Sequence, residues 1–71
     1  MKLMELTING ATRAFDSPLT LAALIEQLGL KPDRVAVEHN LALVQRPQWE
    51  SIALADGDRL EIVQFVGGGA I

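Results

Sequence analysis

The length, composition and charge of the chain limit what it can do. It has 71 residues, 49% of them hydrophobic and 21% charged, which predicts one small folded domain with little room for a buried catalytic pocket. It has no cysteine and one histidine, which excludes disulfides, zinc–thiolate sites, cysteine nucleophiles and metal sites built from several histidines. The net charge of −3, without a cluster of Lys or Arg, argues against nucleic acid and favours a partner with a basic docking groove.

We expect neither a secretory signal nor a membrane span. The apolar stretch after Lys2 is interrupted by Glu5 and is too short for the hydrophobic region of a signal peptide. No apolar run approaches the ~20 residues that a membrane-spanning helix needs. The sequence therefore predicts a soluble cytoplasmic protein that has no membrane partner.

The first fifteen residues predict a β-hairpin. Hydrophobic residues from Leu3 to Ile8 nearly alternate with polar ones, which is typical of a strand with one buried face. Asn9-Gly10 follows, and this pair favours a tight hairpin turn because both residues tolerate positive φ. Residues 11–15 would then form the returning strand.

One amphipathic helix is expected next. Ser17 can serve as its N-cap, with Pro18 at the first helical position, where the missing N–H costs nothing. Hydrophobic residues then recur at the spacing of one helical face, at Leu21, Leu24, Ile25 and Leu28. Gly29 is a typical C-terminal stop, so we expect a helix of about ten residues.

Short elements are expected in the middle of the chain. Val35 and Val37 indicate a strand that ends in a turn at His39-Asn40, and residues 41–44 indicate a short partner strand. Pro47 cannot continue a central strand because it has no N–H to donate. A short helical turn is expected instead over residues 48–52.

The last strand is expected over residues 60–65, after a tight turn at Asp56-Gly57-Asp58. Leu60 and Ile62 lie on one side of this strand, while Val63 and Phe65 lie on the other. Hydrophobic residues on both sides predict a central strand with a partner on each edge.

The order of these elements predicts an α+β fold with one helix across a mixed sheet of four to five strands. If the first and last strands pair in the middle of the sheet, they run parallel, and the fold is the ubiquitin-like β-grasp. We expect this domain to occupy residues 1–66 and a flexible glycine tail to occupy residues 67–71.

Three consecutive glycines, Gly67, Gly68 and Gly69, permit two interpretations. They can be an unstructured chain end without a function. They can also be a tail that enters a narrow channel, because glycine lacks a Cβ and lets the backbone approach a partner closely. The composition of the tail does not decide between the two.

Three longer stretches carry a resemblance to a known family. Residues 35–40, 44–50 and 56–69 resemble the ThiS family of thiamine-pathway sulfur carriers, and the first hairpin and the helix fit the same family. The most specific part is the ordered combination of the Asp-Gly-Asp turn, the final strand and the end Phe65-Val66-Gly67-Gly68-Gly69. The likeness covers nearly the whole chain.

The resemblance implies a protein that is acted on and is not itself an enzyme. In this family an E1-like adenylyltransferase joins the carboxylate of the last glycine to AMP. A sulfur donor system that includes a cysteine desulfurase then converts the acyl-adenylate to a thiocarboxylate, and thiazole synthase takes the sulfur. The resemblance implies no cofactor or metal. Gly69 corresponds to the activated glycine, and Gly67 and Gly68 to the segment that enters the channel.

Ala70-Ile71 depart from the family pattern. While they are present, the Gly69 carbonyl belongs to a peptide bond and offers no carboxylate. They can be removed by a processing protease, can derive from a cloning vector, or can mark a protein that has lost the carrier role. The intact glycines favour the first two explanations over the third.

The remaining polar and aromatic residues are given structural interpretations. His39 is expected to be a turn residue without a nearby partner, and Asp56 and Asp58 are expected to form a turn and not a cation site. Trp49 is expected to pack in the core, with an interface anchor as the alternative. Arg46 and Arg59 are expected to be solvated surface charges.

Phe65 and Val66 flank the tail and form a possible apolar collar for docking, although burial in the sheet accounts equally well for Phe65.

Two other functions remain open at this point. A sulfur carrier of another pathway, such as the small subunit of molybdopterin synthase, would share the tail chemistry. A ubiquitin-like interaction module would have no chemistry at all. A self-contained enzyme is disfavoured because no pair of nucleophile and base is evident.

Overall fold

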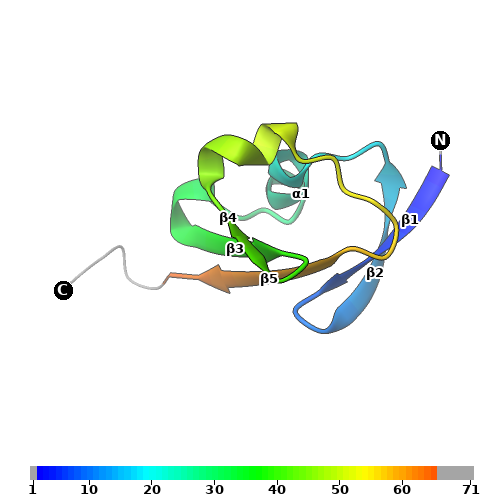
Figure 1. Ribbon diagram of the computed structural model, residues 1–71, viewed down its shortest axis with the longest axis horizontal. Coiled ribbons are helices and arrows are strands. Elements are labelled where there is room, and N and C mark those ends of the chain that lie inside the picture. The colour runs from blue at the N-terminus through cyan, green and yellow to red at the C-terminus, as the bar shows by residue number, and fades with distance from the viewer. Residues whose placement is uncertain (1, 66–71) are drawn as a thin grey trace.

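The computed structural model describes residues 2–65 of the chain. Its elements are β1 (Lys2–Ile8), β2 (Ala11–Ser17), α1 (Leu21–Gln27), η1 (Pro32–Arg34), β3 (Val35–His39), β4 (Ala42–Val44), η2 (Arg46–Ser51) and β5 (Arg59–Gln64). The strands form one sheet, and α1 lies across one side of it (Figure 1).

The sheet has the topology that the sequence predicted. Its strand order is β2-β1-β5-β3-β4, with β5 in the centre. β1 pairs with β5 in parallel, and the other neighbours are antiparallel. The parallel pair at the centre confirms the β-grasp arrangement.

The N-terminal hairpin forms as predicted. Asn9 and Gly10 both have positive φ, of 51° and 84°, as a tight hairpin turn requires. The two strands pair from Ile8 and Ala11 at the turn to Lys2 and Ser17 at the open end. The second hairpin turns at Asn40 and Leu41, one residue later than predicted, so that His39 is still part of β3.

The start of the helix differs from the prediction. Ser17 is the last residue of β2, and its hydroxyl donates to the Lys2 carbonyl. Leu19 is buried and its carbonyl accepts from the Leu54 N–H, which keeps this segment extended. The helix therefore begins only after Thr20, whose side chain accepts from the Ala23 N–H at 3.1 Å. It has seven residues instead of about ten.

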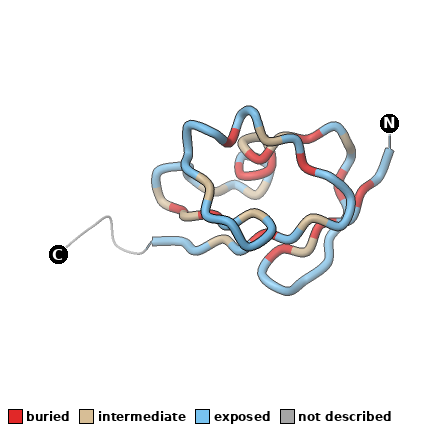
Figure 2. Tube along the Cα trace, viewed as in Figure 1, coloured by how far each residue is buried: buried red, intermediate tan, exposed pale blue. Residues whose placement is uncertain are grey.

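The hydrophobic core lies between α1 and the sheet (Figure 2). Its fully buried side chains are Leu6, Leu21, Leu24, Ile25, Val37 and Leu60. Trp49 is 3% exposed and its indole N–H donates to the Val44 carbonyl, which confirms the core interpretation. Within residues 2–65, no helix is long and apolar enough to cross a membrane.

β5 is central, but the reason given for this prediction was wrong. Leu60 on the helix side is completely buried, whereas Val63 on the opposite side is 59% exposed. The hydrophobic residues on both sides of the strand therefore do not reflect burial on both faces. One face of the sheet has no covering layer within the described residues.

Candidate functional site

The residues predicted to carry function lie at and beyond the end of β5. Phe65 follows β5 directly and is the last residue that the structure describes. Val66, Gly67, Gly68 and Gly69 lie outside the described residues. The described part of the site is therefore the strand that leads into the tail, with the contacts that hold it.

Backbone pairing fixes the end of β5 to β3. Gln64 pairs with Val35, and the Phe65 N–H donates to the Arg34 carbonyl at 2.7 Å. The Phe65 side chain is 52% exposed. Burial in the sheet, one of the two expectations for Phe65, is thus wrong, and its docking role remains a prediction.

The Asn9 side chain holds the middle of β5 from the other edge. β1 pairs with β5 only as far as Ile8 and Leu60, because the chain turns away at Gly10. The amide of Asn9 continues the pairing by one step. Its Oδ1 accepts from the Ile62 N–H at 2.7 Å, and its Nδ2 donates to the Ile62 carbonyl at 3.1 Å.

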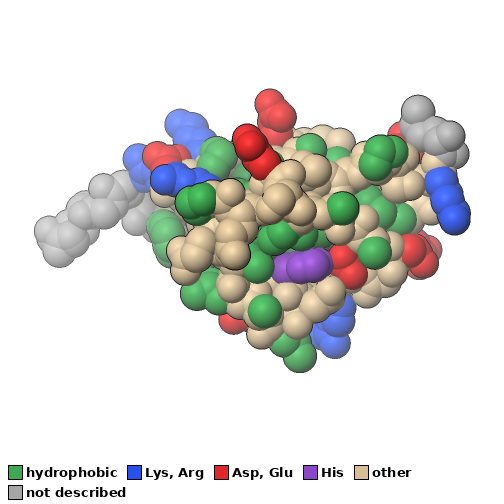
Figure 3. Space-filling model, turned by 45° about the horizontal axis from the view of Figure 1, so that its top comes forward, with side chains coloured by type: hydrophobic (Ala, Val, Ile, Leu, Met, Phe, Trp, Pro, Cys, Tyr) green, Lys and Arg blue, Asp and Glu red, His purple; other side chains and the backbone are tan. Residues whose placement is uncertain are grey.

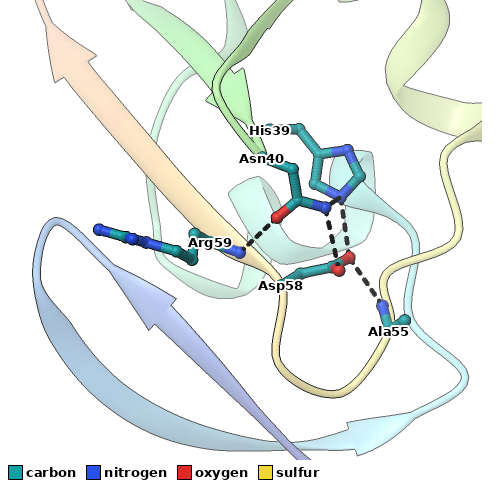
Figure 4. A network of polar contacts seen from close by, with 5 residues as sticks. All are labelled: His39, Asn40, Ala55, Asp58 and Arg59. Carbon is teal, nitrogen blue, oxygen red and sulfur yellow. Dashed lines mark hydrogen bonds and ion pairs between the residues drawn. The ribbon is translucent and has the colours of Figure 1, made fainter.

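A polar network holds the start of β5, as Figure 4 shows. Asp58 Oδ2 lies 2.8 Å from His39 Nε2 and accepts from the Ala55 N–H at 2.9 Å. Asn40 donates to Asp58 Oδ1 and accepts from the Arg59 N–H. The network joins the β3–β4 turn to the loop before β5.

The network also lowers the pKa of Asp58. Partial burial raises the pKa of this carboxyl, but hydrogen bonds from His39, the Ala55 N–H and Asn40, together with the charge of His39, outweigh burial. The pKa therefore lies below its ordinary value of 3.8. The carboxylate is ionised at neutral pH, and both of its oxygens accept structural hydrogen bonds.

The second aspartate of the turn is structural as well. Asp56 Oδ1 accepts from the Glu5 N–H at 2.7 Å, and the Gly57 N–H donates to the Glu5 carbonyl. These bonds confirm that Asp56 and Asp58 form a turn. Figure 3 shows the histidine as a partly covered ring at the surface, next to acidic side chains.

Comparison with known proteins identifies the family. A model of the ThiS family matches residues 3–69. The chain belongs to the ThiS family. A crystal structure of the thiamine biosynthesis protein ThiS from Geobacter metallireducens superimposes with a TM-score of 0.79 at 32% identity, covering 93% of this chain and all of that one.

Two curated relatives extend the comparison of this ThiS-family chain. Over 50 residues it is 36% identical to the sulfur carrier protein ThiS of Bacillus subtilis, covering 70% of this chain and 76% of that protein. Over 67 residues it is 46% identical to a thiazole synthase of Paramagnetospirillum magneticum. That match covers 94% of this chain but only 21% of the synthase, so the chain spans about a fifth of that relative's length.

The structure of this ThiS-family domain corrects the prediction for His39. The sequence predicted a turn residue without a partner, whereas its imidazole contacts Asp58, 19 positions later. Sequence reasoning also missed the side chain of Asn9, which bonds to a residue 53 positions away. The order of the strands in the sheet was the signal that could have suggested both contacts, since it brings these segments together.

The surface residues behave as expected where the structure describes them. Arg46 and Arg59 are exposed, as predicted. Among residues 2–65, neither arginine nor any lysine lies within ion-pair distance of a carboxylate. The polar groups that hold β5 in place are therefore the Asp58 network and the amide of Asn9.

Proposed function

We propose that this ThiS-family protein carries sulfur for the formation of the thiazole ring of thiamine, as a thiocarboxylate on Gly69. The observation that carries the proposal is the extent of the family match, which runs through the whole domain and ends at Gly69. The match to ThiS favours the thiamine pathway over the molybdopterin pathway that the sequence left open.

The firm attachment of β5 to the rest of the sheet supports this role. The strand lies in the centre of the sheet, and hydrogen bonds fix it at its start, middle and end. Two residues after the last of these bonds, the glycines begin. A partner that binds the domain would therefore meet the tail from a fixed starting point.

The chemistry belongs to the chain end and to the partner enzymes. The Gly69 carboxylate attacks the α-phosphorus of ATP, and pyrophosphate leaves. The terminal sulfur of a persulfide then attacks the acyl carbon, AMP leaves, and a thiol reduces the acyl disulfide to the thiocarboxylate. An E1-like adenylyltransferase, a cysteine desulfurase system and a thiazole synthase are the partners that this scheme requires. The carrier is their cosubstrate.

The scheme requires a free carboxylate on Gly69. With Ala70-Ile71 attached, the Gly69 carbonyl is an amide carbonyl, which cannot attack ATP. We propose that a protease removes these two residues before activation. Gly67 and Gly68 then form the segment that enters the active sites of the partners.

The test compares the 71-residue chain with a chain that ends at Gly69. Each is incubated with ATP, a ThiF-like adenylyltransferase and a sulfur donor, and its intact mass is measured. The shorter chain should gain an adenylyl group and then lose AMP, with one carboxylate oxygen replaced by sulfur as the net change, whereas the longer chain should stay unchanged. Equal modification of both chains would contradict the need for processing.

A substitution in the tail separates activation from folding. In the chain that ends at Gly69, Gly68→Val adds a branched side chain where the proposal requires a narrow segment. We expect adenylation to fall by at least about a hundredfold, which corresponds to about 2.7 kcal/mol of transition-state stabilisation. The unfolding midpoint should remain unchanged, and a large decrease in it would show that the tail is part of the fold.

A further inference from the structure

The uncovered face of the sheet carries an apolar strip that ends where the tail begins. Val63 of β5 and Leu43 of β4 project on this face, and Phe65 directly follows β5. They are 59%, 63% and 52% exposed. Ala36 of β3 lies between them, opposite Val63, and it helps to line a shallow depression with Leu43 and Val63. Figure 2 shows the exposed end of β5 leading to the undescribed residues.

Two glutamates face each other across the same strip. Glu38 of β3 and Glu61 of β5 are directly opposite in the antiparallel register, and both are exposed. Like charges in this position destabilise a strand pair. Arg59 lies two residues before Glu61, but among residues 2–65 no Lys or Arg lies within ion-pair distance of a carboxylate. The free domain therefore holds two adjacent carboxylates beside exposed apolar side chains.

We propose that this strip, formed by Ala36, Glu38, Leu43, Glu61, Val63 and Phe65, is the surface on which thiazole synthase docks. An apolar area of the synthase covers Leu43, Val63 and Phe65, and one Arg or Lys of the synthase lies between the two glutamates. This inference rests on the proposed function, because it names the surface that delivers the tail to that partner.

The choice of this occupant follows from three observations. A stretch 46% identical to this chain occurs within a longer polypeptide named thiazole synthase, so a domain similar to this one is covalently joined to that enzyme. The strip adjoins the start of the tail, so that a protein bound there also receives the glycines. The paired carboxylates call for a cation in the centre of the contact.

A second copy of this chain is a poor occupant for the same strip. A self-complementary contact would bring two pairs of carboxylates together, and like charges placed across an interface are strongly unfavourable. The glutamates therefore disfavour self-association while they favour a basic partner. The net charge of −3 acts in the same direction at longer range.

The test measures the affinity of variants for purified thiazole synthase from the same source, without ATP, by titration calorimetry. All variants are made in the chain that ends at Gly69. Val63→Ser and Glu61→Arg should each raise Kd by about tenfold or more, as expected for residues at the centre of an interface. Leu41→Ser and Glu50→Gln are the matched controls, because both residues are exposed and lie outside the strip. They should change Kd less than twofold.

The Glu61→Arg variant separates docking from folding. Its arginine can pair with Glu38 across the strands, so the unfolding midpoint of the free domain should rise while binding weakens. Unchanged binding of Val63→Ser and Glu61→Arg would overturn the proposal. It would also be overturned if these variants lost binding to the adenylyltransferase alone, since that enzyme would then be the occupant.

Formation of the thiocarboxylate is measured separately in the same variants. Thiocarboxylate formation, measured by intact mass, tests the proposed function and does not require thiazole synthase. If thiocarboxylate formation is normal and the substitutions in the strip leave the Kd for the synthase unchanged, the docking surface is refuted and the carrier function is not. Failure of thiocarboxylate formation in the unmodified chain that ends at Gly69 would refute the carrier function, whatever the binding data show.

Discussion

The two ends of β5 are held in different ways. At its start, side chains from separate segments converge: Asp58 bonds to His39, Asn40 and Ala55, and Leu60 next to them is completely buried. At its end, backbone pairing with β3 continues, but Val63 and Phe65 are more than half exposed. The first end serves stability, and the second carries the exposed strip that we propose as a docking surface.

The largest expected effect contrasts a residue at each end. Leu60→Ala removes a completely buried side chain beside the anchored end and should lower the free energy of unfolding by about 3 kcal/mol. Val63→Ala at the exposed end should change it by less than about 0.5 kcal/mol. Urea unfolding followed by tryptophan fluorescence measures both. A similar decrease in the free energy of unfolding in both variants would contradict the difference between the two ends.

The next effect tests the polar network at the start of β5. Asp58→Ala removes an acceptor shared by His39, Asn40 and the Ala55 N–H. Hydrogen bonds to a charged group contribute more than neutral ones, so the free energy of unfolding should fall by about 2 kcal/mol. Arg46→Ala, which alters an exposed charge, is the control and should leave it nearly unchanged. If Asp58→Ala left the free energy of unfolding unchanged, the network would not anchor the strand.

A smaller effect is expected at Asn9, where β5 is held in the middle. Asn9→Gly keeps a residue that tolerates the positive φ of the turn but removes both side-chain bonds to Ile62. The free energy of unfolding should fall by about 1 kcal/mol. Hydrogen exchange of the Ile62 amide should accelerate more than that of Leu60. Unaltered exchange at Ile62 would argue against the side-chain clamp.

The smallest effect is a dependence on pH. Because the pKa of Asp58 is lowered in the folded protein, its ionised form favours folding above the ordinary value of 3.8. This contribution is lost as the pH falls through the folded pKa. The stability difference between the native chain and Asp58→Asn should therefore be constant above about pH 5 and shrink below about pH 4. A difference that stays constant in acid would contradict the lowered pKa.

The sequence predicted those parts of the fold that depend on local pattern. The alternation from Leu3 to Ile8, the Asn9-Gly10 turn and the helical face of α1 are each visible within a few residues. The central place of β5 was also predicted, although by an argument from burial that the exposed Val63 shows to be wrong. What made the prediction succeed was the order of the elements.

Contacts between distant segments account for the errors. Ser17 has the residue type of a helix cap, but pairing of Leu19 with Leu54 delays the helix to Leu21. The partner of His39 lies 19 positions away and the partner of Asn9 lies 53 positions away. Patterns among neighbouring residues give no information on contacts between residues so far apart in the sequence. At the candidate site, the sequence named Phe65, but the structure was needed to show that its side chain is exposed.

The position of β5 between two hairpins has a consequence during synthesis. β1 pairs with β2 and β3 pairs with β4, and within the described sheet only β5 joins one pair to the other. The ribosome makes β5 last of the five strands. The sheet therefore cannot close until residues 59–64 have emerged, and a nascent chain stalled before that point holds two unconnected hairpins. The segment that would receive sulfur is thus translated only after the last strand of the domain has been made.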